Sequence, residues 1–188
     1  MNPRNLVGSA LSLAQAQADE GDSPSLVHRS RSRHFVEALA GEFRTHYALQ
    51  PSIRVLSKHF PGHRADFGLN ELLFDVLVCD TSTVRSATDS ATLVFVTRGL
   101  WAVESEFARD TRQAIFDFNK LVLASTDYKL FVGPQVADQS AFLEPLLPPA
   151  GKCGGEVFIA LVPHPSEWTT GRSDVDVFQL RQTVWQAL

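Results

Sequence analysis

Acidic side chains inside otherwise apolar segments are the residues of this sequence best suited to chemistry. Asp75 interrupts the run LLFDVLVCD, and Glu104 and Glu106 stand two residues apart in the run WAVESEF. A buried carboxylate without a partner costs several kcal/mol. Side chains two apart on a strand share one face, where like charges repel each other. A hard divalent cation such as Mg²⁺ binds carboxylate oxygens and would offset that repulsion. The spacing therefore predicts an acidic metal site formed by strand residues.

A further carboxylate for this site comes from the helix expected over residues 26–50. At about 100° per residue, the apolar stripe of this helix defines its core face. The stripe consists of Phe35, Leu39, Phe43 and Tyr47. Glu42 falls at the edge of this face, whereas Glu37 falls on the opposite side and points to water. We therefore expect Glu42, and not Glu37, to look toward the sheet and to join the acidic strand residues.

Each of these acids also has a plain structural alternative. Asp75 could cap a loop at the end of a strand, and Glu104 and Glu106 could lie on the solvated face of an edge strand, because most acidic side chains are exposed. The joint order favours a site over these alternatives. In that order a helix Glu is followed by a strand Asp, a strand Glu-x-Glu and another helix.

The elements that would position these residues follow from hydrophobic periodicity and turn residues. Strands are expected at 53–58, 72–80, 93–98, 101–107, 128–132 and 156–162. The segments 93–98 and 101–107 are either two strands or one long strand bent at Gly99. Helices are expected at 26–50, 110–125 and 138–147 and from Ser173 onward, and a polar loop at 81–92. This order predicts an α/β fold with a mixed sheet of about five strands flanked by helices.

The length of 188 residues favours a single main domain. Residues 1–27 are rich in Ala, Gln and Ser and are broken by Gly-Asp-Ser-Pro at 21–24, which predicts a flexible or helical N-terminal arm. Residues 28–188 are expected to form one α/β domain. The arm and the long helix after it could support a homodimer.

The charge balance limits how nucleic acid could be bound. The chain has 17 Lys and Arg against 21 Asp and Glu, a net charge of −4, which excludes a protein that binds nucleic acid by a strong overall basic excess. A local basic region remains, because residues 29–64 hold seven Lys and Arg but two acids. The candidate nucleic-acid-binding residues are Arg44, Arg54, Lys58, Arg64 and Arg112.

Cysteine usage and hydropathy indicate a cytoplasmic protein without a membrane partner. Cys79 and Cys153 form no CxxC pair, so no disulfide framework and no cysteine zinc site is indicated. No apolar run approaches the roughly 18 residues that a membrane-spanning helix needs. The first residues lack the continuous apolar core of a secretory signal.

Taken in order, the acidic elements resemble those of the PD-(D/E)XK nuclease superfamily, which has the restriction-endonuclease-like fold. The matching elements are the helix with Glu42, the strand FDVLVCD, the strand AVESEF, the helix TRQAIFDFNKLVLAS and the strand YKLFVGP, roughly residues 30–135. The resemblance implies hydrolysis of phosphodiester bonds in DNA with Mg²⁺, or Mn²⁺, as the cofactor. It implies that Asp75, Glu104 and the backbone carbonyl of Ser105 hold the ion, with Glu42 at the edge of the site.

One position departs from the pattern of that superfamily. Glu106 stands where a Lys is usual, two residues after the Glu, and a carboxylate there could act as a general base or ligand but not as a stabilising cation. On the helix at 110–125, Arg112 lies about 60° from Ile115 and Lys120 about 140°, so Arg112 is the expected replacement cation. The departure leaves an alternative, a catalytically inactive nuclease-fold protein that binds nucleic acid or a protein partner. An unrelated α/β protein with acids on an edge strand is a further alternative.

Overall fold

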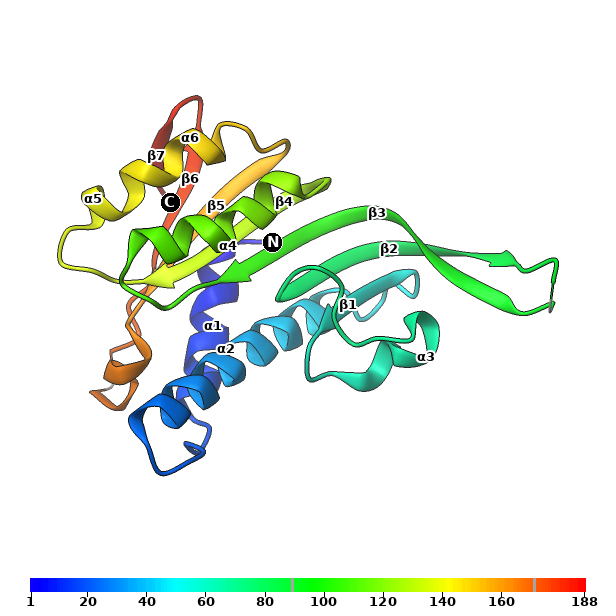
Figure 1. The fold of residues 1–188 in the computed structure, drawn as a ribbon, viewed down its shortest axis with the longest axis horizontal. Helices are drawn as coiled ribbons and strands as arrows, with labels where there is room; N and C mark the ends of the chain where they lie inside the picture. The colour runs from blue at the N-terminus through cyan, green and yellow to red at the C-terminus, as the bar shows by residue number, and fades with distance from the viewer. Residues whose placement is uncertain (89, 171) are drawn as a thin grey trace.

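The computed structural model describes residues 1–88, 90–170 and 172–188, and within them seven strands form one mixed sheet in the order β1-β2-β3-β4-β5-β6-β7 (Figure 1). The strands are β1 (Ile53–Ser57), β2 (Val76–Arg85), β3 (Thr92–Ser105), β4 (Thr126–Pro134), β5 (Glu156–Val162), β6 (Asp176–Arg181) and β7 (Val184–Ala187). The first three strands are antiparallel neighbours, β3, β4 and β5 are parallel, and β6 and β7 are antiparallel again. The expected α/β class with a mixed sheet is thus confirmed.

Helices cover both faces of this sheet. They are α1 (Pro3–Gln15), α2 (Pro24–His46), α3 (Arg64–Phe67), α4 (Thr111–Leu123), α5 (Gln139–Leu143) and α6 (Leu147–Ala150), with 3-10 turns η1 (Pro61–His63), η2 (Glu144–Leu146) and η3 (Pro165–Thr170). Helices α1 and α2 pack on one face, and α4, α5 and α6 pack on the other (Figure 1). Helix α4 connects the parallel strands β3 and β4, a connection that must cross over the sheet. No helix among the described residues is long and apolar enough to cross a membrane.

Alternation along β3 decides which layer each of its side chains meets. Trp101 and Val103 are buried in the core under α1 and α2, whereas Ala102 is buried in the core under α4. Because side chains alternate between the faces of a strand, Glu104 falls on the α4 face. The next residue, Ser105, ends the strand on the α2 face. The end of β3 therefore offers polar side chains to both layers.

Strands β2 and β3 continue beyond the body of the sheet as a two-stranded arm (Figure 1). The expected polar loop at 81–92 is therefore wrong in its first part, because β2 runs to Arg85 and pairs there with Thr92. Of the two alternatives at Gly99, one continuous strand is correct, and register shifts bend it on both sides of Gly99. A side chain at Gly99 would place its Cβ 2.5 Å from Thr126 Cγ2, so the close approach of β3 and β4 requires glycine.

The final segment corrects the expected secondary structure. The helix expected from Ser173 is wrong, because this segment forms β6 and β7 at the edge of the sheet. Val175, Val177 and Gln179 are buried at every second position, which is the period of a strand and not of a helix. The sheet consequently has more strands than expected. In the segment before residue 28, α1 and the first residues of α2 are helical and are joined by a non-helical stretch at 16–23, and α1 contributes buried residues to the core under α2.

Candidate functional site

Asp75 joins the beginning of β2 to the end of β3. Its Oδ2 accepts hydrogen bonds from the backbone N–H of Ser105 at 2.9 Å and from Ser105 Oγ at 2.7 Å. Burial raises the pKa of Asp75, and the two bonds from Ser105 oppose that rise. Its Oδ1 accepts no hydrogen bond from the described residues. The carboxylate is thus held through its Oδ2 at the junction of β2 and β3.

Glu104 is a buried carboxyl group with one oxygen unpaired. The residue is 1% exposed, its Oε2 accepts a hydrogen bond from Lys120 Nζ at 2.9 Å, and its Oε1 has no partner among the described residues. Burial, followed by the charge of Asp75, raises the pKa of Glu104 to about 8, even though Lys120 opposes the rise. Buried polar atoms without a partner are rare and costly. The unpaired Oε1 therefore leaves an acceptor that a ligand could use.

Lys120 of α4 is the cation of this site. Its Nζ lies 2.9 Å from Glu104 Oε2 and 2.8 Å from Asp117 Oδ1. Desolvation lowers the pKa of Lys120, but the hydrogen bonds that its ammonium donates to Asp117 and Glu104 outweigh this effect, so the pKa is raised and the ammonium stays charged. The Lys120 side chain is 47% exposed, as expected, but its ammonium pairs with Glu104, so Lys120 and not the expected Arg112 is the cation beside this carboxyl. Arg112 is exposed and lies 5.8 Å from the Phe116 ring.

The wrong prediction of the cation has a simple geometric cause. The buried line of α4 consists of Ala114, Phe118 and Leu121, while Ile115 is only partly buried. Measured from that line at about 100° per residue, Asp117 and Lys120 lie on the same flank, and Arg112 lies nearly opposite the core. The four-carbon stem of Lys120 then carries its ammonium from this flank to the buried carboxyl.

Glu106 lies near the same cluster but turns to its own loop. Its Oε1 accepts the backbone N–H of Ala108 at 2.6 Å. Burial and the carboxylates of Asp117 and Asp75 raise its pKa. Within the part of the chain that the structure describes, no group of three or more His, Cys, Asp or Glu side chains could hold a metal ion. The expected acids therefore do not converge as a triad, and Asp75 and Glu104 are the neighbouring pair.

The helix carboxylate nearest to β1 is Glu37, and not Glu42 as expected. Glu37 accepts hydrogen bonds from Ser57 Oγ at 2.8 Å and from the backbone N–H of His59 at 2.9 Å. Glu42 instead lines a small cavity with residues of α1. Helix α2 is buried on two flanks, by the sheet and by α1, so its apolar stripe does not reveal which flank meets the sheet. Glu42 is thus placed away from Asp75.

The five expected nucleic-acid-binding residues have different surroundings. Arg44 is partly buried, forms an ion pair with Glu37 and lies 3.9 Å from the Phe60 ring. Arg54 forms an ion pair with Asp66 at 2.8 Å. These two arginines therefore hold local structure together. Lys58, Arg64 and Arg112 are exposed.

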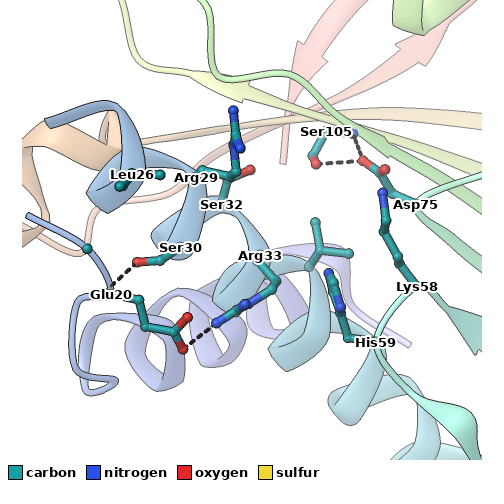
Figure 2. A pocket seen from close by; sticks show the side chains of 12 residues that line it. Glu20, Leu26, Arg29, Ser30, Ser32, Arg33, Lys58, His59, Asp75 and Ser105 are labelled. Atoms are coloured by element: carbon teal, nitrogen blue, oxygen red, sulfur yellow. Dashed lines mark hydrogen bonds and ion pairs between the residues drawn. The ribbon is translucent and has the colours of Figure 1, made fainter. Parts of the chain in front are cut away.

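A cavity of about 540 Å³ adjoins Asp75 on the α2 side (Figure 2). It is lined by Glu20, Gly21, Leu26, Arg29, Ser30, Ser32, Arg33, Val36, Lys58, His59, Asp75 and Ser105. Figure 2 shows the α2 side chains on one side of this space and Asp75, Ser105 and Lys58 on the other. The spacing of Arg29, Arg33 and Val36 places these residues on one helix face and could have predicted this cavity. The basic composition of the segment did not distinguish them from the other basic residues.

No family model, curated protein or solved structure matches this chain. The geometry combines a carboxylate pair, Asp75 and Glu104, with one unpaired buried oxygen, a charged Lys120 and a cavity with cationic walls. Such a combination suits the binding of a divalent cation and a phosphate group.

Glu104→Gln is expected to stabilise the protein at alkaline pH. The pKa of Glu104 rises from 4.5 to about 8 on folding, so the folded chain binds more protons between these values and the free energy of unfolding falls as pH rises. Glutamine removes this ionisation. We expect the melting temperatures of both proteins to agree near pH 4, below the unfolded pKa, and the variant to melt about 5 °C higher near pH 9. Thermal melts across this range test the prediction, and a difference independent of pH would contradict it.

Proposed function

We propose that this chain is a metal-dependent nuclease that cleaves DNA, with a PD-(D/E)XK-like site whose cation comes from α4. The order α2-β1-β2-β3-α4-β4 supports the proposal, because it repeats the order of elements on which the resemblance rests. The observation that carries the proposal is Glu104. Its buried carboxyl binds Lys120 through one oxygen and leaves the other unpaired beside Asp75.

The residues present fit a divalent cation. Asp75 Oδ1, Glu104 Oε1 and the backbone carbonyl of Ser105 would hold it, and Mg²⁺ commonly uses one or two carboxylates together with water and substrate phosphate. Two protein carboxylates therefore suffice for this ion. When bound, Mg²⁺ or Mn²⁺ supplies a Lewis acid at the scissile phosphate and lowers the pKa of a bound water.

The side chains of the protein supply the remaining functions. Lys120, held by Asp117 at 2.8 Å, places a fixed positive charge where negative charge develops in the transition state. This replaces the cation that Glu106 cannot provide. Glu106 has a raised pKa, which suits a general base for the attacking water.

A second function is favoured by the same ion pair. Lys120 already neutralises part of the charge of Glu104, as it would in a nuclease-fold protein that has lost its metal and binds nucleic acid or a protein partner. The two functions differ in whether Glu104 Oε1 serves a ligand. Metal binding and cleavage distinguish them directly.

Mn²⁺ is expected to raise the melting temperature of the wild-type protein, because a ligand that binds only the folded state stabilises it. The same protein should convert plasmid, linear duplex, single-stranded DNA or RNA to shorter products with Mg²⁺ or Mn²⁺ and stop when EDTA is added. Glu104→Gln serves as the matched variant in the melts and should show no Mn²⁺ shift. If no substrate is cleaved and millimolar Mn²⁺ does not raise the melting temperature, the nuclease function is contradicted and the catalytically inactive alternative is favoured.

A further inference from the structure

The cavity beside Asp75 has the size and walls of a nucleotide site. Its volume of about 540 Å³ lies within the range of about 300–1,000 Å³ typical of pockets for small organic ligands. Leu26 and Val36 give it apolar walls, and Arg29 and Lys58 bring positive charge. An apolar wall suits a nucleobase, and a cationic rim suits its phosphate.

The cations of this cavity are available to a ligand. Among the described residues, neither the Arg29 guanidinium nor the Lys58 ammonium has a hydrogen-bond or ion-pair partner, although both line the cavity. Arg33 is bound to Glu20, whose side chain is 57% exposed. Arginine and lysine without internal partners are the usual ligands of nucleic-acid phosphates.

The cavity also reaches Asp75 of the proposed reaction centre, although Glu104 and Lys120 are not among its lining residues. Asp75 and Ser105 line its wall opposite α2 (Figure 2). A nucleotide placed in it therefore brings a phosphodiester group to Asp75. His59 lines the same space, and an imidazole ring can stack on an unpaired base.

We propose that this cavity holds one unstacked nucleotide of the strand to be cut, so that the substrate is single-stranded or frayed nucleic acid and not intact duplex. This inference rests on the proposed nuclease function and names its substrate class. A paired base cannot enter a hollow of this kind unless it leaves its stack, and unpairing costs least where the strand is already single.

Glu20 occupies the position of a competing anion. It forms an ion pair with Arg33 and lies 3.5 Å from His34 Nε2. A phosphate that binds Arg33 must displace this carboxylate, because both anions use the same guanidinium. Glu20→Gln is therefore expected to tighten the binding of single-stranded DNA about threefold or more. Glu144→Gln is the matched control, because Glu144 is exposed and outside the cavity.

Fluorescence anisotropy tests the inference, with a labelled single-stranded oligonucleotide and a hairpin duplex of the same length in EDTA. We expect the single strand to bind at least about ten times more tightly than the duplex. Arg29→Glu should weaken that binding about tenfold, whereas Arg181→Glu, at an exposed position on β6, should change it less than about twofold. Both variants should fold, since both replaced side chains are exposed, and thermal melts check this.

Equal or tighter binding of the duplex would overturn the inference, as would unchanged binding by Arg29→Glu or no binding of either DNA. These results are distinct from failure of the nuclease function. If single strands bind in the cavity but no metal supports cleavage, the nuclease function fails and the nucleotide site stands. If duplex and single strand are cleaved at equal rates, the nuclease function stands and the nucleotide site fails.

Discussion

Lys120→Met lowers the rate of Mg²⁺-dependent cleavage by about 10³-fold, if Lys120 is the cation that stabilises the transition state. The variant keeps the aliphatic stem of the side chain and removes the charge 2.9 Å from Glu104. It also leaves the Glu104 carboxyl beside Asp75 without its cation, so the pKa of Glu104 should rise further. Single-turnover cleavage at saturating enzyme measures the effect on the chemical step.

Arg112→Met is the matched control on the same helix. Arg112 is exposed and points away from the buried line of α4, so its replacement should change the cleavage rate less than about threefold. If both variants cleave at the wild-type rate, Lys120 has only a structural role. If Arg112→Met is the slower of the two, Arg112 and not Lys120 supplies the cation.

Asp75→Asn is expected to abolish cleavage, with a loss of about 10³-fold or more, while the fold is retained. The asparagine carbonyl can still accept the hydrogen bonds from Ser105 that join β2 to β3. The variant loses the negative charge that a divalent cation requires. We expect no Mn²⁺ shift in its thermal melt and a melting temperature within a few degrees of the wild type.

Glu42→Gln is the control for Asp75→Asn, because it removes one negative charge on the flank of α2 that lines a cavity with α1. Its cleavage rate should equal that of the wild type. A loss of activity in Glu42→Gln comparable with that in Asp75→Asn would show that the helix carboxylate belongs to the site. Retained cleavage by Asp75→Asn would remove Asp75 from the proposed metal ligands.

The sequence predicted the part of the site that depends on strand alternation. Glu104 and Glu106 were expected on one strand face from a period of two. Strand β3 ends at Ser105, so Glu104 alone lies in the strand, yet both acids lie near Asp117 of α4. The expectation that Asp75 and Glu104 lie close together fits the structure, in which their two strands are antiparallel neighbours. Local periodicity suffices for such features, since backbone geometry alone fixes them.

Features that depend on packing between layers could not be predicted in this way. Which flank of a helix meets the sheet is decided by its neighbours, and α2 has neighbours on two flanks. That is why Glu37 and not Glu42 lies at β1. Contacts made by long side chains also cannot be predicted from a helical pattern. Lys120 starts on an exposed flank of α4 and still binds a buried carboxyl.

The strands at the end of the chain were missed for a different reason. Phe178, Arg181 and Trp185 have a spacing that also fits a helix, so the period of the last segment is ambiguous. Pairing of β6 with β5 resolves the ambiguity, because the sheet supplies hydrogen-bond partners that a local pattern does not contain.

The most direct test of the proposed nuclease centre is the cleavage of single-stranded DNA by the wild type and by Glu104→Gln, with Mg²⁺ and with EDTA. Both proteins should be folded, since the variant removes a buried ionisable group whose pKa is raised to about 8. We expect the wild type to cleave with Mg²⁺ and to stop in EDTA, and Glu104→Gln to be inactive in both. Cleavage by Glu104→Gln at the wild-type rate, or wild-type cleavage that persists in EDTA, would contradict a metal-dependent centre at Glu104.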